Sequence, residues 1–288
     1  ISSVKSTDLE NMPVFRVEQS LQGRTSGLTI TSASGQPGEA STVRVRGTTT
    51  IGNSDPLYVV DGVVVGGGID YLSQADIETI DVLKDAASAA IYGTQGANGV
   101  ILITTKKGKA GGIKVNYNGF VGTQAPWRKL DLLNATEYAT LLNESYMAAG
   151  QPIRFANPSS YGKGTDWQDV VFQNATYQKY DLTVSKGDDN TQFLLGTGYL
   201  GQEGTVRFSG LERYNIRFNI DSRVNDNFHI GANLNLARTN EDMIDVEING
   251  VVRSALFQPP TVDVYNPDGT YAGPGANEGD AQNPLGMA

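Results

Sequence analysis

The sequence predicts an α/β domain with a small mixed sheet and short helices, followed by antiparallel transmembrane strands of a partial β-barrel. Up to about residue 110, short apolar runs and short helical patterns alternate with glycine-rich turns, which is typical of a small mixed sheet. Beyond residue 110, apolar and polar residues alternate strictly over stretches of about ten residues or more. Long strands with one apolar and one polar face are typical of a barrel wall that separates lipid from a wet lumen.

The composition excludes several classes of protein. The chain has 288 residues, a net charge of −9 and no cysteine. A nucleic-acid-binding protein needs a basic face that neutralises phosphates, and this acidic sequence contains none, so we expect no nucleic-acid partner. The absence of cysteine excludes disulfides, thiolate zinc sites and cysteine nucleophiles. No run of about 18 apolar residues occurs, so no membrane-spanning helix is expected.

The first part of the chain contains a series of short elements. Apolar residues at helical spacing predict a helix over 14–21, which ends before Gly23. A second helix is predicted from Asp85, as its N-cap, to about Ile91. Strands are predicted at 28–31, 42–46, 57–60, 77–83 and 100–105.

The predicted strand 42–46 alternates valine with arginine. Val43 and Val45 would lie on one face of this strand, and Arg44 and Arg46 would lie on the other. An arginine in a protein interior is tolerated mainly when it is paired and hydrogen-bonded. We therefore expect Arg44 and Arg46 to be buried in the assembled protein and paired with acidic groups or carbonyls.

Three glycines at regular spacing, Gly93, Gly96 and Gly99, could suggest a phosphate-binding loop. Such a loop follows a strand and opens a helix, so that its amides point at the anion. Here the glycines follow a predicted helix and precede a predicted strand. Tight turns are therefore the favoured interpretation.

A cluster of four carboxylates lies within ten residues of sequence, at Asp76, Glu78, Asp81 and Asp85. On a strand, Asp76 and Glu78 would share one face and Asp81 would lie opposite. No second acidic cluster or histidine completes a set of metal ligands, so a solvated face or ion pairs with Arg44 and Arg46 are favoured. The only histidine, His229, has no triad motif around it. We expect no metal site, no cofactor and no enzymatic activity.

Five long strands are predicted in the second part of the chain, at about 113–123, 177–187, 190–201, 211–223 and 226–239. Their connections are alternately long and short. Bacterial barrels have short periplasmic turns and long external loops, so the first strand is expected to run outward from the periplasm. The first long loop is predicted to contain a helix over 134–149, and the segment after the last strand is acidic.

The fourth of these strands has the clearest alternation of apolar and polar residues. The residues predicted to face lipid are Tyr214, Ile216, Phe218 and Ile220. The residues predicted to face the lumen are Asn215, Arg217 and Asn219. A shift of one residue in register would turn every polar group toward lipid, so the pattern fixes the orientation of the strand.

Three stretches between Asp55 and Gly108 resemble a known family. They read DPLYVVDG from Asp55, DIETIDVLKDAASAAIYG from Asp76 and GANGVILITTKKG from Gly96. Their order and wording resemble the plug domain of TonB-dependent outer-membrane transporters, and more narrowly the SusC/RagA group. The resemblance implies a plug domain over 1–110 and the first part of a barrel over 111–288, with about five of the roughly 22 strands of a plugged barrel.

The resemblance also implies a function, a location and partners. Members of this group actively import glycans or peptides across the bacterial outer membrane and perform no covalent chemistry on the cargo. A SusD-like surface lipoprotein covers the barrel, and TonB pulls on the plug from the periplasm. The plug loops 48–54 and 66–71 are expected to face the exterior. The residues expected to contact cargo are Thr48, Thr49, Thr50, Asn53, Asp70 and Tyr71.

Three alternatives from other classes remain open. The first is a TonB-dependent transporter for siderophores or cobalamin. The second is a secreted carbohydrate-active enzyme, which would need two carboxylates about 5 to 9 Å apart in a cleft. The third is a secreted carbohydrate-binding or surface-adhesion module without transport.

Overall fold

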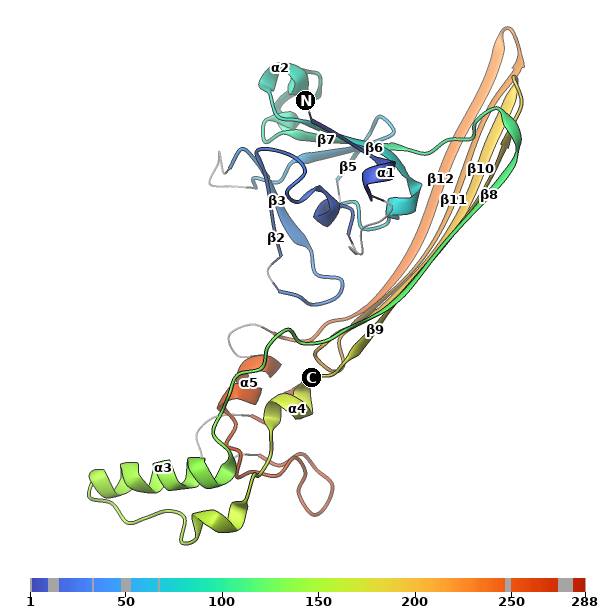
Figure 1. The fold of residues 1–288 in the computed structure, drawn as a ribbon. Helices are drawn as coiled ribbons and strands as arrows, with labels where there is room; N and C mark the ends of the chain where they lie inside the picture. Colours follow the sequence, from blue (N-terminus) through green and yellow to red (C-terminus); the bar gives the residue numbers. More distant parts are fainter. Residues whose placement is uncertain are drawn as a thin grey trace.

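The structure, a computed structural model, describes residues 2–9, 16–32, 34–47, 53–66, 68–246, 250–273 and 282–287. It has a compact N-terminal part, built from residues up to Thr105, and a long curved sheet beside it (Figure 1). Helices of the long loops lie beyond one end of that sheet (Figure 1). Within the described residues, no helix is long and apolar enough to span a membrane.

The N-terminal part contains the mixed sheet that the sequence predicts. Its strand order is β1-β6-β7-β4-β5, and only the β4–β7 pair is parallel. These strands are β1 (Ser2–Lys5), β4 (Leu57–Val60), β5 (Val63–Val65), β6 (Ile77–Leu83) and β7 (Val100–Thr105). A second sheet pairs β2 (Leu28–Ser32) with β3 (Ser41–Val45). The helical elements are α1 (Ser6–Leu9), α2 (Ala86–Ala89) and the 3-10 turns η1 (Glu18–Leu21), η2 (Gln74–Asp76) and η3 (Ala90–Gly96).

The core of this part lies between the two sheets. Ile80 of β6 and Ile101 and Ile103 of β7 are almost fully buried, and Val43 and Val45 of β3 pack with them. Burying each large aliphatic side chain contributes roughly 1.5 to 3 kcal/mol. The valine face of β3 is therefore the inner face, as its alternation predicts.

Of the two predicted helices of this part, the first is reduced to one turn in the described residues. The second, predicted from Asp85 to about Ile91, is present, because α2 continues directly into η3 and the backbone leaves helical geometry at Gly93. In the described residues of 14–21, the structure has a single 3-10 turn, η1, and Val17 and Leu21 are buried as the apolar spacing requires. Asp85 does precede a helix, α2, but its carboxylate binds Arg46 (2.6 Å) instead of the helix amides. The spacing identified the buried residues correctly, but it did not require a full helix.

Two glycine turns explain the motifs of this part. Asp61 and Gly62 both have positive φ (49° and 85°) and form the two-residue turn between β4 and β5. Gly99 has φ 95°, and a Cβ there would lie 2.9 Å from the side chain of Val45. The geometry at Gly99 is a tight turn before a strand, as predicted in preference to a phosphate loop.

The long sheet contains all five predicted strands, each antiparallel to its neighbours in sequence order. They are β8 (Gly111–Gln124), β9 (Ala175–Gly187), β10 (Thr191–Glu203), β11 (Gly210–Asn225) and β12 (Phe228–Asp242). Each has 13 to 16 residues, more than the roughly 9 to 11 that a tilted strand needs to cross a bilayer. Short turns join β9 to β10 and β11 to β12, and long connections lie at the opposite end, which is the outer end in such barrels.

The two faces of β11 are oriented as the alternation predicts. Tyr214 and Ile216 are 47% and 52% exposed on the outer face, whereas Arg217 and its neighbours Asn215 and Asn219 are buried against the N-terminal part. On the outer face Tyr214 adjoins Tyr199, which in turn adjoins Tyr180, with ring centroids 5.0 and 6.3 Å apart. Such a row of amphipathic rings is typical of the edge of a lipid-facing band.

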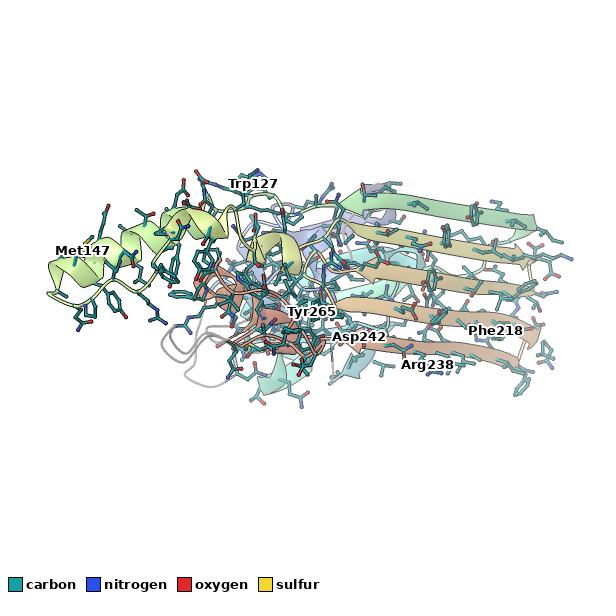
Figure 2. The ribbon with its side chains drawn as sticks, turned by 90° about the horizontal axis from the view of Figure 1, so that it is seen from below. Trp127, Met147, Phe218, Arg238, Asp242 and Tyr265 are labelled. Atoms are coloured by element: carbon teal, nitrogen blue, oxygen red, sulfur yellow. The ribbon has the colours of Figure 1, made fainter. Side chains whose placement is uncertain are left out.

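The long connections contain their own small folded region. Helix α3 (Ala135–Ala148) begins with a capping box in which Asn134 and Glu137 exchange side-chain to backbone hydrogen bonds of 3.0 Å, which confirms the predicted helix. Helices α4 (Trp167–Val171), α5 (Val251–Phe257) and α6 (Pro284–Met287) share a buried cluster. We call α4, α5, α6 and this cluster the loop module. Figure 2 shows Trp127 and Met147 beyond the end of the strands, on the same side as this module.

Candidate functional site

The contact between the N-terminal part and the long sheet centres on Arg217. Its side chain is 1% exposed, in the middle of β11. Nη1 donates to the backbone oxygen of Asp76 (2.7 Å) and Nη2 to that of Lys106 (2.6 Å). The Lys106 amide itself donates to the Asp76 oxygen (2.8 Å). One buried guanidinium thus binds the start of β6 and the end of β7 together, which supplies the partners that a buried charge requires.

The carboxylate of Asp76 lies beside this guanidinium, with 3.9 Å between Oδ1 and Nη1. The Asn215 amide lies 3.4 Å from its other oxygen. Burial raises the pKa of the Asp76 carboxyl above its ordinary value, and the Arg217 charge opposes that rise. This pair is the most strongly buried ion pair among the described residues.

Further polar contacts follow the segment from Asp70 to Asp76 along the wall of strands. Arg213 donates to the Asp70 backbone oxygen (2.6 Å), and Ser73 donates to the Asp181 carboxylate (3.0 Å). Asp181 lies at the level of Asn215, and Asp76 contacts Arg217. The segment therefore runs from the outer part of β11 toward its middle.

Two glycines of β10 make room for this polar layer. Gly196 lies opposite Arg217, and Gly198 lies opposite Asn215. A Cβ at Gly198 would lie 2.5 Å from Asn215 Oδ1 and 2.8 Å from Asp181 Oδ1. Any larger residue at this position would have to displace the polar side chains.

The motif Asp61-Gly62 also contributes to the contact. The Asp61 carboxylate accepts the Thr105 amide (2.9 Å) at the end of β7 and the side-chain amide of Asn233 on β12 (2.6 Å). The aspartate therefore closes the β4–β5 turn region against β7 and binds the long sheet. This double role gives a physical reason for the second Asp of the DPLYVVDG stretch.

A cavity of about 610 Å³ opens in the N-terminal part. Its charged side chains include Arg16, Glu18 and Asp55, and Tyr58 also lines it. Burial raises the pKa of the Tyr58 hydroxyl above its ordinary value, so this group stays a neutral donor. Donors and acceptors on an apolar base suit a polar, uncharged or zwitterionic ligand.

The predicted cargo-contact residues are divided by this geometry. Asn53 and Asp70 both line the cavity, so the structure brings the two predicted loops together there. Tyr71 is half-buried and packs against the core instead. Thr48, Thr49 and Thr50 lie outside the described residues.

The predicted arginine pairs lie away from the Arg217 contact. Arg44 forms an ion pair with Asp55, and its side chain is 28% exposed. Arg46 pairs with Asp85 and is 59% exposed. Their full burial in a closed barrel stays a prediction.

The carboxylate cluster is arranged differently from the sequence-based interpretation. Asp76 lies in the 3-10 turn η2 before β6, so Asp76 and Glu78 do not form a pair on one strand face. Glu78 pairs with Lys109 (2.9 Å), and only Asp85 pairs with one of the two arginines. Within the described residues, no group of three or more histidine or acidic side chains could hold a metal ion.

The sequence did not indicate the partner of Arg217. Its position on the polar face of β11 was predicted, and a charge in the middle of a barrel strand requires a partner. Asp76 lies 141 residues earlier in the chain, in the turn η2 of the N-terminal part. No local spacing connects the two residues.

Comparison with known proteins agrees with this architecture. The family profile described as TonB-dependent Receptor Plug Domain matches residues 1–100. The TonB-dependent receptor P26 of Formosa agariphila is 38% identical over 281 residues, which cover 95% of this chain and 28% of the relative. The TonB-dependent receptor SusC of Bacteroides thetaiotaomicron is 30% identical over 282 residues, covering 94% and 27%. The chain thus spans 28% or less of the length of these curated relatives.

Solved structures give the same result. The RagAB peptide transporter superposes with a TM-score of 0.82 and 26% identity, covering 99% of this chain and 36% of that one. The siderophore receptor PirA of Acinetobacter baumannii, with a TM-score of 0.56 and 19% identity, shares the fold alone. These relatives are receptors and transporters, not enzymes. The chain belongs to the SusC/RagA group of TonB-dependent transporters of the bacterial outer membrane, with its N-terminal part as the plug and its long sheet as part of the barrel wall.

Proposed function

We propose that the transporter containing this chain imports a polar nutrient, an oligopeptide or an oligosaccharide, and that the plug closes the barrel until TonB pulls on it. The observation that carries this proposal is the polar contact between plug and wall around Arg217 and Asp76. The similarity to a structure described as a peptide transporter supports the cargo class. The division of the chain at residue 110 into plug and barrel is part of the same proposal.

The chemistry of the contact suits a plug that must hold and then yield. Its members are mainly hydrogen-bonding groups, such as Arg217, Asn215 and Ser73. A hydrogen bond exchanged for bonds to water changes the free energy by only about 0.5 to 1.5 kcal/mol net. Separating an apolar interface instead costs about 25 cal/mol for each Å² exposed. A polar contact can therefore break and re-form under a modest force.

The cavity that contains Asn53 and Asp70 is the proposed contact for cargo. Peptides and sugars both present alternating donors and acceptors, which the amide, carboxylate and hydroxyl groups of this cavity can bind. The loop residues Thr48, Thr49, Thr50 and Tyr71 belong to the same proposal; Tyr71 follows Asp70 in the chain and packs against the core.

A SusD-like surface lipoprotein is the proposed partner at the outer end. Large apolar side chains are exposed there, including Trp127 (95%) and Phe257 (64%). Exposed apolar groups of this size commonly mark protein contacts. The siderophore alternative has weaker support, because the likeness to PirA extends to the fold alone.

Uptake by cells that carry the full-length transporter tests the proposal. Labelled oligopeptides and oligosaccharides are supplied in separate arms, with and without TonB. We expect uptake in one of the two arms and its loss without TonB. For the double variant Asn53→Ala/Asp70→Ala we expect about tenfold weaker cargo binding, because about two hydrogen bonds are removed. Lys107→Ala changes an exposed residue of the plug away from the cavity and serves as the control. TonB-independent uptake, or no uptake in either arm, would overturn the proposal.

A further inference from the structure

The turn between β2 and β3 of the plug contacts the outer end of the wall. The Ile244 amide, two residues beyond the end of β12, donates to Gln36 Oε1 (2.9 Å). The Glu241 side chain packs on Gly38, where a Cβ would lie 3.0 Å from Glu241 Cδ. Plug and wall therefore meet here without room for a larger side chain.

Three segments surround this turn. A cavity of about 240 Å³ lies between Gln36 and Pro37 of the turn, Val206 of the β10–β11 connection, and Val246 and Val252 of the segment after β12. The turn thus closes one side of a space that is otherwise bounded by the long connections. If the turn moved away, the apolar side chains of that space would be exposed to water, which is unfavourable.

The same segment continues directly into the loop module. The side chain of Ile244 packs on the cluster formed by Trp167, Val171 and Val251, and Val206 packs on it as well. The backbone oxygen of the next residue, Asp245, accepts a hydrogen bond from the Val251 amide at the start of α5 (2.8 Å). Ile244 therefore contacts the plug through its backbone and the loop module through its side chain.

On the plug side, the turn is connected to the proposed cargo cavity. Arg16 donates to the Gly38 backbone oxygen (2.7 Å) and forms an ion pair with Asp70. Asp70 lines the cavity, and its backbone oxygen accepts from Arg213 of the wall. A continuous set of contacts runs from the cavity through Arg16 to the turn and on to Ile244.

We propose that the contact of Gln36 and Gly38 with Glu241 and Ile244 couples the loop module to the position of the plug. This inference rests on the proposed function, in which the plug moves during import. Withdrawal of the plug removes the acceptor of the Ile244 amide and opens the cavity beneath α5, so the loop module loosens. By reciprocity, a partner that holds the loop module also favours the seated plug.

Hydrogen exchange on the full-length transporter in lipid nanodiscs tests the coupling. Gln36→Ala removes the acceptor of Ile244, and we expect exchange over 241–246 and 250–257 to become about five- to tenfold faster, the effect of losing one hydrogen bond with some packing. Gln22→Ala is the matched control, because Gln22 donates to Ile30 within the plug. The reverse variant, Ile244→Ala, is expected to accelerate exchange in the turn 34–38.

The outcomes separate the coupling from import itself. Unchanged exchange over 241–246 and 250–257 in Gln36→Ala, or equal acceleration in Gln22→Ala, would overturn the coupling even where uptake is normal. Absence of TonB-dependent uptake in the wild type would contradict the proposed function, whatever the exchange pattern. Normal barrel assembly of each variant, measured by heat-modifiable mobility, ensures that a change in exchange reports a local effect.

Discussion

Arg217 of β11 and Asp76 of the plug face each other across the plug–wall contact, with only 1% and 8% of their side chains exposed. Arg217 also binds two backbone oxygens of the plug, so the pair is part of a network and not an isolated ion pair. Removing one member of such a buried pair leaves the other charge without compensation.

Substitution of Arg217 should release the plug. For Arg217→Ala we expect the plug to be held about 3 to 5 kcal/mol less tightly, since two backbone oxygens lose their donor and the Asp76 carboxylate loses its opposite charge. Protease sensitivity of the plug in the assembled transporter measures this. Arg223→Ala changes an exposed arginine of the same strand and should behave as the wild type. Equal sensitivity of the two variants would contradict the role given to Arg217.

The stability of the seated plug should depend on pH through the Asp76 carboxyl. Because burial raises the pKa of Asp76 in the folded protein, the seated state binds more protons than the released state above the ordinary value of 3.8. The contribution of the Asp76 carboxyl to the stability of the seated plug is therefore fully present below pH 3.8, and it decreases as pH rises through the raised pKa. Hydrogen exchange of the plug between pH 4 and 7, corrected for intrinsic rates, should show this decrease in the wild type and a flatter profile in Asp76→Asn. Ser73→Ala removes a neighbouring contact without removing a titratable group, and it should keep the wild-type slope.

The lipid-facing assignment can be tested with adjacent residues of β12. Leu234 lies opposite Phe218 on the outer face, and Asn233 lies on the inner face beside Asp61. An arginine at the bilayer midplane costs roughly 2 to 4 kcal/mol, so Leu234→Arg should impair barrel assembly strongly. Asn233→Arg places the charge next to the Asp61 carboxylate and should assemble normally. Comparable assembly yields of Leu234→Arg and Asn233→Arg in outer-membrane fractions would contradict the assignment. Ile216→Arg should impair assembly as Leu234→Arg does.

The glycines of β10 should be intolerant of a side chain where the plug is near. Gly198→Ala is expected to weaken plug seating by about 1 to 3 kcal/mol through overpacking against Asn215 and Asp181. Gly231→Ala, in the same wall with open space around it, is the control. The second substitution Asn215→Ala should partly restore seating in Gly198→Ala, measured again by protease sensitivity. No rescue would indicate that the cost arises elsewhere.

Much of the fold could be predicted because its signals are local. A period of two along a strand states which face is apolar, and so the five wall strands and the orientation of β11 follow from the sequence. In the described part of the helix predicted over 14–21, the structure has only the turn η1, which is enough to bury Val17 and Leu21. Short apolar patterns do not distinguish one helical turn from several.

The site was predicted less completely because its members come from distant parts of the chain. Asn53 and Asp70 do line one cavity, but the Asp76–Arg217 and Gln36–Ile244 contacts join residues of different sheets or loops. Tyr71 was expected to contact cargo because the resemblance implies that its loop faces the exterior. Its ring is half-buried and packs against the core, and its contact with cargo stays a prediction.

The contacts of the plug occur at graded depths in the membrane, measured from the tyrosine row that includes Tyr214. Arg213, beside that row, binds Asp70, whereas Asn233 binds Asp61 at the level of Asn219, six residues or about 20 Å farther along β11. A pull from the inner side would load the deepest contact first and the shallower ones in turn. The contacts between plug and wall would then break one after another, and the peak force would be set by the strongest single contact and not by the sum of all contacts.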